Sequence, residues 1–431
     1  MNNKRIKSVK AYKTFFMYAS LIYLGGATVL TRYKMTTLNA DFGGILAILL
    51  VLFLCDLCKV SFKNKNLLII LGLLSVWTFL QSIKWQQLLF PSSLFWDVIA
   101  GYIICKAYKN SIFRYYEKCM FSLCVIALIL WLTSMIIPFF PELLKKITPN
   151  WMHGLVESNI LVFGLQAPGS GAALIFRRNV GFAWEPGRFA SFIILAMFIN
   201  LVINKFRFRG NYHFWLFLAT LLTTQSTTGY ATLVVILVAY LYNAKIKYFI
   251  GTSIVALPVM LMLFSLPFMT EKMKNLMIGK EHNAEILNQF EYRTYQGEIF
   301  VPQRFDGMLW EAYNFIKDPL LGYGKDTERS FTGRKFKNQV VLYNGTIKIF
   351  AMFGIFWGLM IYYLFYKGSV YFSQYYKIKG TLFLFILFFL VNVSYPFHTE
   401  PIFLAMFCIP FFNPTLHLRI FSLRKMAYEI C

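Results

Sequence analysis

Charged and aromatic side chains gather directly before an apolar stretch in the middle of the chain. Residues 177–188 read Arg-Arg-Asn-Val-Gly-Phe-Ala-Trp-Glu-Pro-Gly-Arg, and residues 189–203 are almost entirely apolar. Charge at the end of a membrane helix is costly unless it is paired, hydrated or bound to an anion. Proline and glycine fit a helix start, and the positive end of a helix favours anions. The segment therefore predicts an anion site at a membrane surface, with candidates Arg177, Arg178, Trp184, Glu185 and Arg188.

Two interpretations of Glu185 stay open. It lies three residues before Arg188, so the pair can form a salt bridge along one helix face. It can equally take part in catalysis. The arginines are stronger candidates for ligand binding, because the planar guanidinium fork suits phosphate.

A second polar region covers residues 270–340 and contains the basic residues Arg293 and Arg304. Within it, Leu309, Tyr313 and Ile316 follow helical spacing. This pattern predicts an amphipathic helix that lies on a membrane surface. The chain then re-enters the membrane near Tyr343 and Asn344.

His398 lies in a short turn between the last two apolar runs, with Glu400 and two prolines nearby. Such a turn can present an acid or a base to a cavity. The competing interpretation is an ordinary interfacial histidine in a hairpin.

The composition is that of a polytopic membrane protein, with 58% hydrophobic and 19% aromatic residues and a mean hydropathy of +0.56. We expect an all-α fold with about twelve transmembrane helices. The expected runs lie near residues 14–30, 42–57, 67–83, 93–108, 119–140, 187–203, 212–223, 229–243, 248–269, 341–366, 380–397 and 399–414.

Basic residues precede the first apolar run and recur in every second loop, which predicts that both termini are cytoplasmic. This alternation explains most of the formal +24 charge without nucleic acid. The same topology places two long segments outside, 141–186 and 270–340, within a single integral membrane domain spanning 1–431. The bilayer is thus the first expected partner.

Several chemistries have no signature in the sequence. It contains no Walker loop, GxGxxG, HExxH or nucleophile elbow, and no paired aspartates of the kind that hold magnesium for nucleotide-sugar chemistry. We therefore expect a reaction without a metal or other cofactor.

Four stretches together resemble the O-antigen polymerase and O-antigen ligase superfamily of bacterial envelope glycosyltransferases. Arg178 and the Glu185-Pro-Gly-Arg188 stretch resemble its arginine-plus-EPG signature, and Gln225-Ser-Thr-Thr-Gly229 resembles its helix junction. Arg304, Trp310 and Asp318-Pro-Leu-Leu-Gly-Tyr-Gly324 resemble its outer-loop run. Tyr343-Asn344 followed by Phe353-Gly-Ile-Phe-Trp-Gly358 resembles its re-entry.

The resemblance implies a GT-C-like enzyme of the bacterial cytoplasmic membrane that joins glycan repeat units on its outer face. The donor would be an oligosaccharide on undecaprenyl diphosphate, transferred with inversion and without metal. Arg188 and Arg304 would clamp the diphosphate with Arg177 or Arg178, and Glu185 or His398 would accept the proton. Further substrate contacts would come from the following residues: Trp184, Arg293, Tyr343 and Asn344.

Tyr343 stands where many ligase-like members carry histidine. This difference favours a repeat-unit polymerase, for which a chain-length regulator is a candidate partner, over a ligase that moves finished glycan to lipid core or protein. A lipid-linked oligosaccharide flippase and a non-catalytic envelope scaffold also fit a basic polytopic chain. A flippase should show internal repeats and charges inside several helices. Neither is evident, and a scaffold would not explain the clustered arginines.

Overall fold

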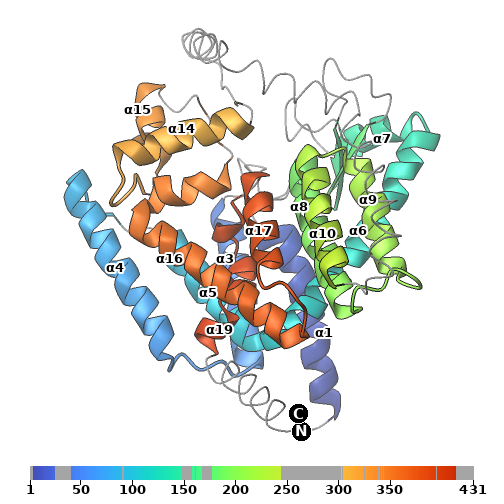
Figure 1. Ribbon diagram of the computed structural model, residues 1–431, viewed down its shortest axis with the longest axis horizontal. Coiled ribbons are helices and arrows are strands. Elements are labelled where there is room, and N and C mark those ends of the chain that lie inside the picture. Colours follow the sequence, from blue (N-terminus) through green and yellow to red (C-terminus); the bar gives the residue numbers. More distant parts are fainter. Residues whose placement is uncertain are drawn as a thin grey trace.

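The structure is a computed structural model of the full chain (Figure 1). It describes residues 3–24, 40–89, 92–147, 158–160, 162–166, 177–243, 302, 304–324, 326–336, 340, 342, 344–394 and 396–413.

Helices make up most of the described chain. The first half contains α1 (Asn3–Ala19), η1 (Ser20–Leu24), α3 (Ala40–Leu57), α4 (Lys65–Trp85), α5 (Ser92–Tyr108), η2 (Lys109–Ser111), α6 (Ile112–Ile136), α7 (Phe140–Ile147), β1 (Ser158–Ile160), β2 (Phe163–Gln166), β3 (Arg178–Gly181) and α8 (Pro186–Ile203). The second half contains α9 (Tyr212–Thr224), α10 (Thr227–Asn243), α14 (Arg304–Lys317), η3 (Thr327–Arg329), α15 (Phe331–Lys335), α16 (Gly345–Tyr376), α17 (Phe383–Ser394), η4 (Phe397–Thr399), α18 (Pro401–Phe407) and α19 (Ile409–Phe412).

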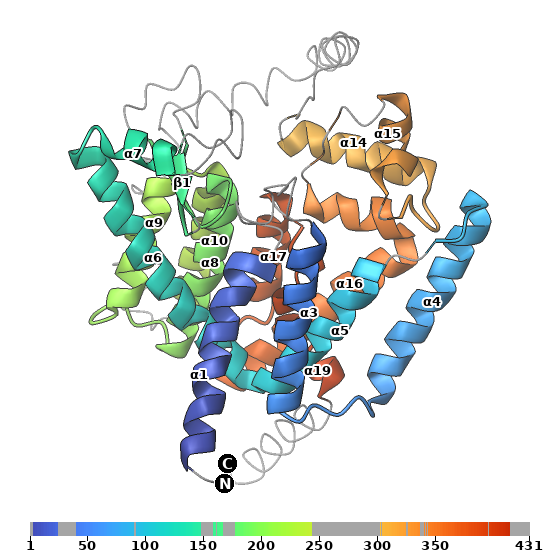
Figure 2. The same cartoon turned by 180° about the vertical axis from the view of Figure 1, so that it is seen from behind.

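Helix α8 is the centre of one group of helices. It packs against α6, α9, α10 and α17, and nearly every side chain along it is buried. A helix that is apolar on all sides belongs in an interior of this kind. Helix α17 also packs against α16, so it joins the α8 group to the α14–α16 group (Figures 1 and 2).

The expectation of about twelve spans is wrong for the part of the chain that the structure describes. Four helical stretches there are long and apolar enough to cross a membrane: Lys65–Trp85, Leu94–Ile136, Pro186–Ile203 and Gly345–Tyr376. Apolar helices of 10–17 residues occur at Ile45–Leu57, Thr227–Asn243 and Phe383–Ser394. The run expected at 248–269 lies outside the described residues.

The difference arises because apolar runs are not always single helices. The run expected at 380–397 holds only the 12 residues of α17, which stops before Pro396. The last run, 399–414, is divided into η4, α18 and α19. Conversely, the long stretch from Leu94 to Ile136 comprises α5 and α6, which a turn at Lys109 separates with a positive φ of 49°.

The fold is also not purely α-helical. Strands β1, β2 and β3 form an antiparallel sheet in that order, within the segment expected to lie outside. Strand β3 leads directly into the turn before α8 and packs against α6, α8 and α9. The sheet therefore fixes how the chain enters α8.

The amphipathic helix expected around Leu309, Tyr313 and Ile316 is α14. Its apolar residues Leu309, Tyr313 and Ile316 are 43%, 41% and 67% exposed, so this stripe faces away from the protein. Its buried side carries Glu311 and Asn314, whose side chains hydrogen-bond to each other over 3.2 Å. An exposed apolar stripe at the end of a membrane protein suits contact with lipid.

A buried ion pair holds α14 to the beginning of α16. Glu311 is 1% exposed and lies 3.9 Å from the Lys348 amine. Burial raises the pKa of the Glu311 carboxyl, while the nearby Lys348 charge opposes the rise. The pair fixes the α14 layer over α16.

Helix α16 is interrupted at Gly354, which has a φ of 78°. The segment after α14 fills this break: the amides of Tyr323 and Gly324 donate to the carbonyls of Ala351 and Met352, each over 2.9 Å. The Ile355 amide donates in return to the Pro319 carbonyl over 2.8 Å. A break in a membrane helix is tolerated where the freed backbone groups find partners in this way.

Helix α4 stands at the edge of the molecule and contacts the same segment at its far end (Figures 1 and 2). Trp77 Nε1 and Gln81 Nε2 donate to the Leu321 carbonyl over 3.2 and 2.6 Å. Lys84 forms an ion pair of 2.6 Å with Asp318. The 318–324 segment thus connects α4 with α16.

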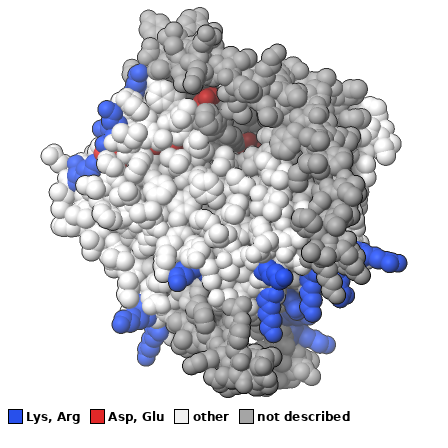
Figure 3. All heavy atoms as spheres, viewed as in Figure 1, with Lys and Arg blue, Asp and Glu red and all other residues white. Residues whose placement is uncertain are grey.

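The surface has a broad uncharged band. On the face drawn in Figure 3, Lys and Arg gather along the lower edge and at the upper left, with mostly uncharged atoms between. Exposed apolar side chains such as Leu73, Val76 and Phe79 cover α4. Together with the four long apolar helices, this uncharged band indicates an integral membrane protein.

The Gly354 break predicts a specific intolerance to alanine. A Cβ at Gly354 would lie 2.0 Å from the Leu320 carbonyl oxygen, and a positive φ costs a non-glycine residue about 1–3 kcal/mol before that clash is counted. Gly354→Ala should therefore lower the thermal unfolding temperature in detergent. Gly72→Ala in α4 is the matched control, because its Cβ would meet nothing within 4 Å. Equal unfolding temperatures for the two variants would contradict this account.

Candidate functional site

The candidate site lies where β3 turns into α8. Glu185 precedes the helix with extended backbone angles, φ −145° and ψ 137°, and Pro186 occupies the first turn. The carbonyl of Glu185 accepts from the Arg188 amide over 3.1 Å. This helix start fixes Glu185 and Arg188 on one side of the first turn.

Arg188 is buried at the head of an apolar helix. Its side chain is only 3% exposed, and its Nε lies 3.7 Å from the Glu185 carboxylate, which is 25% exposed. The guanidinium carbon lies 3.7 Å above the ring of Trp184. A buried guanidinium needs such neutralisation, and an aromatic face adds to it. The salt bridge, one of the two interpretations that the sequence left open for Glu185, is present, and the partly exposed carboxylate connects this pair to the surface.

Arg178 lies beside this pair and is engaged with the protein backbone. Its Nε and Nη2 donate to the carbonyls of Thr224 and Gln225 over 3.2 and 3.1 Å, at the end of α9. Burial lowers the pKa of its guanidinium, while the charge of Glu185 acts in the opposite direction. Cations stabilise the carbonyl end of a helix, so Arg178 ties β3 to α9.

Hydroxyl groups from distant parts of the chain surround Gly187. A Cβ at this position would lie 3.7 Å from both Ser226 Oγ, at the start of α10, and Ser394 Oγ, at the end of α17. Ser394 also donates to Thr228 Oγ1 over 2.9 Å. Sequence reasoning missed these hydroxyls, because only the fold brings residues 226 and 394 together.

Asn344 caps the start of α16. Its Oδ1 accepts from the amides of Thr346 and Ile347 over 3.0 and 3.1 Å. Its Nδ2 is buried and has no hydrogen-bond partner among the residues that the structure describes. The neighbouring Gly345 packs tightly against the backbone of Asn392 and Pro396.

The turn after α17 therefore adjoins several helix starts. Ser394 lies near the start of α8 and bonds to the start of α10, while Asn392 and Pro396 contact the start of α16. Helix N-termini carry partial positive charge and free amide donors. Together with two arginines, they make the region around the Glu185 carboxylate electropositive.

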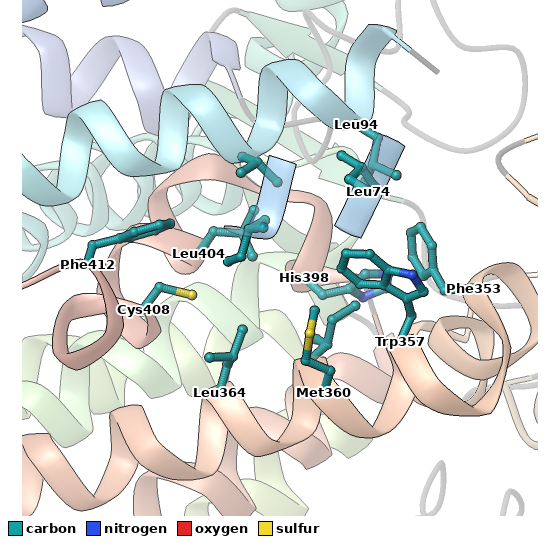
Figure 4. A pocket seen from close by; sticks show the side chains of 13 residues that line it. Leu74, Leu94, Phe353, Trp357, Met360, Leu364, His398, Leu404, Cys408 and Phe412 are labelled. Atoms are coloured by element: carbon teal, nitrogen blue, oxygen red, sulfur yellow. The ribbon is translucent and has the colours of Figure 1, made fainter. Parts of the chain in front are cut away.

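His398 belongs to a different surrounding. It is 5% exposed and lines a cavity of about 70 Å³ whose other walls are apolar side chains of α4, α5, α16, α18 and α19. Its ring stands nearly perpendicular to Phe353, with 6.2 Å between ring centres. In Figure 4 it lies at the Trp357 and Phe353 end of this cavity. The sequence left open whether His398 meets a cavity or is an ordinary interfacial histidine, and it could not predict the apolar lining found here.

Of the remaining site residues predicted from the sequence, only some lie in the described part of the chain. Arg177 is half-buried, and its carbonyl accepts from Trp131 Nε1 over 2.8 Å. Arg304 is the first residue of α14, and its side chain lies outside the described part of the structure. Arg293 and Tyr343 lie outside the described residues. Whether they join Arg188 stays a prediction.

In the described part of the chain, no three His, Cys, Asp or Glu side chains gather closely enough to hold a metal ion. No protein-family model and no curated protein matches this chain. Fold and composition define the class as a mainly helical membrane protein.

The backbone contacts of Arg178 predict a structural contribution. Arg178→Ala removes the donors to the carbonyl end of α9 and should lower stability by about 1.5–3 kcal/mol, the range for hydrogen bonds to charged groups. Arg178→Lys keeps the charge without the planar fork, so it should fall between wild type and Arg178→Ala. Thermal unfolding of the purified variants measures this order, and three identical unfolding temperatures would contradict it.

Proposed function

We propose that this protein is a glycosyltransferase that joins lipid-linked oligosaccharide repeat units into O-antigen, capsule or exopolysaccharide on the outer face of the bacterial cytoplasmic membrane. The observation that carries the proposal is the buried Arg188, held by Glu185 and Trp184 at the head of the central helix. A guanidinium at the end of a membrane helix suits a substrate with a diphosphate at that depth.

The proposed reaction exchanges one glycosidic bond for another. The bond between the anomeric carbon of the donor glycan and its diphosphate oxygen breaks, and the acceptor hydroxyl oxygen bonds to that carbon with inversion. The hydroxyl proton passes to a protein base, and polyprenyl diphosphate leaves with the bonding electron pair. Negative charge grows on the diphosphate as it leaves, so preorganised cations lower the barrier.

We propose that Arg188 makes the main protein contact with that diphosphate. The starts of α8, α10 and α16 support it through their amides and dipoles. Arg178 contributes positive charge from β3, beside the carbonyl end of α9, and Arg304, the first residue of α14, is a further proposed contact. Arg177 and Arg293 are further proposed contacts.

The apolar cavity beside His398 is a candidate binding region for the lipid part of the donor. The cavity beside His398 is lined almost wholly by apolar side chains of α4, α5, α16 and the last helices. An isoprenoid chain gains by burying apolar surface there. We propose that this region receives the chain segment nearest the diphosphate.

Glu185 is the better-placed base. Its carboxylate is 25% exposed and lies beside Arg188, the proposed diphosphate-binding residue, whereas His398 is 5% exposed in an apolar wall. A proton acceptor must come within hydrogen-bond reach of the attacking hydroxyl. We therefore propose Glu185 as the acceptor, while His398 shapes the neighbouring cavity.

A strain that lacks the protein tests the function as a whole. A size-resolved glycan profile should show single repeat units on lipid or core and no ladder of longer products. Ladder accumulating on polyprenyl diphosphate would instead identify a ligase, and repeat units trapped on the cytoplasmic side a flippase.

Arg188→Ala should reduce polymer formation about 10²–10³-fold, the usual effect of losing one preorganised donor to a developing negative charge. The variant is expressed in the deletion strain, and the polymer is quantified by size. Arg114→Ala is the matched control, because Arg114 is an exposed arginine of α6. Normal polymer in Arg188→Ala at equal membrane abundance would rule out the diphosphate clamp.

Glu185→Gln and His398→Ala separate the two candidate bases. Glu185→Gln should abolish polymer and flatten the pH dependence of the residual rate, whereas His398→Ala should retain the wild-type pH profile. Both are compared at equal abundance, because Glu185→Gln also removes the partner of a buried arginine. Full activity in Glu185→Gln would exclude Glu185 and return His398 as the base.

A further inference from the structure

A second cavity lies at the end of the molecule opposite α14, between α6 and the loop that joins α8 to α9. Its volume is about 590 Å³, and polar side chains form much of its lining. The reaction proposed above uses no residue of this cavity.

The floor of the cavity is a buried polar network. Glu117 Oε1 lies 2.5 Å from His213 Nδ1 and accepts from Asn200 Nδ2 over 2.8 Å. Asn211 Nδ2 donates to Asn200 Oδ1 over 2.7 Å. The one carboxylate of the lining is thus already engaged by protein groups.

The wall of the cavity is a compact loop with three cations, Lys205, Arg207 and Arg209. The loop is fixed by the buried Phe206, which is 8% exposed and whose amide donates to the Leu201 carbonyl over 2.7 Å. None of the three cations forms an ion pair with any residue that the structure describes. The lining therefore carries three uncompensated cations against one engaged carboxylate.

Two exposed aromatic residues place this cavity at the membrane interface. Tyr212 and Trp215, at the start of α9, are 69% and 54% exposed. Tyrosine and tryptophan collect at the depth of the lipid headgroups, where one edge of the ring is apolar and the other wet. Tyr212 itself lines the cavity.

We propose that this cavity binds a phosphate-bearing ligand, with the headgroup of an anionic phospholipid as its source. Arginine and lysine around a polar recess suit phosphate, and the neighbouring aromatic residues bring the recess to headgroup depth. The competing explanation is that the basic residues only set the orientation of the protein in the membrane. That role needs neither a recess nor a fixed loop conformation, so it predicts no specific lipid binding at this cavity.

Native mass spectrometry of the purified full-length protein tests the site with phosphatidylglycerol as the probe. Wild type should retain one tightly bound lipid. The triple variant Lys205→Gln, Arg207→Gln, Arg209→Gln should bind it at least about tenfold more weakly, because each basic residue near a membrane surface adds to anionic-lipid affinity. The control Lys63→Gln, Lys65→Gln, Arg114→Gln removes three exposed cations that do not line the cavity and should bind like wild type.

Competition identifies the source of the phosphate group. If millimolar inorganic phosphate does not displace phosphatidylglycerol, the site binds a lipid headgroup. If inorganic phosphate does displace it, the site binds a soluble phosphate compound. Wild-type affinity in the triple variant, or an equal loss in the control, would overturn the proposal. If the triple variant does not elute as a single species, Arg207→Gln alone, an exposed change outside the helices, should still weaken binding about threefold.

Discussion

The buried guanidinium of Arg188 sets the main constraint on this structure. A charge that is 3% exposed at the head of an apolar helix needs partners that the protein itself supplies. Glu185 and Trp184 supply them from the turn immediately before α8, so that turn has to be held in place. Strand β3 holds it from one side, because Arg178 and Asn179 anchor the strand to α9. The hydroxyls of α10 and α17 adjoin it from the other side.

A second constraint is the break in α16. Gly354 opens the helix, and the 318–324 segment satisfies the freed backbone groups. The same segment is bound by the far end of α4. The α14 layer, α16 and α4 are therefore coupled, and α17 couples them to α8. This is how a site built from residues 185, 226, 344 and 394 can be positioned by one framework.

Sequence patterns predicted the parts of this framework that depend on neighbours in the chain. The amphipathic α14 was predicted from helical spacing, and a Glu185–Arg188 salt bridge was one of the two interpretations that their spacing of three residues left open. The number of spans was overestimated, because an apolar run of spanning length can hold a short helix such as α17 or several helical turns. The sheet was missed, since its strands are three or four residues long and pair through tertiary contacts. The Ser394–Thr228 bond joins residues 166 positions apart, which no local pattern can reveal.

The most direct test of the account is a reaction with purified protein and a defined lipid-linked repeat unit, with the glycan products resolved by size and polyprenyl diphosphate measured in the same samples. We expect a ladder of longer glycans and the release of one polyprenyl diphosphate for each new linkage. Repeat units that remain single while the folded protein binds the lipid-linked donor would contradict the proposed polymerase activity.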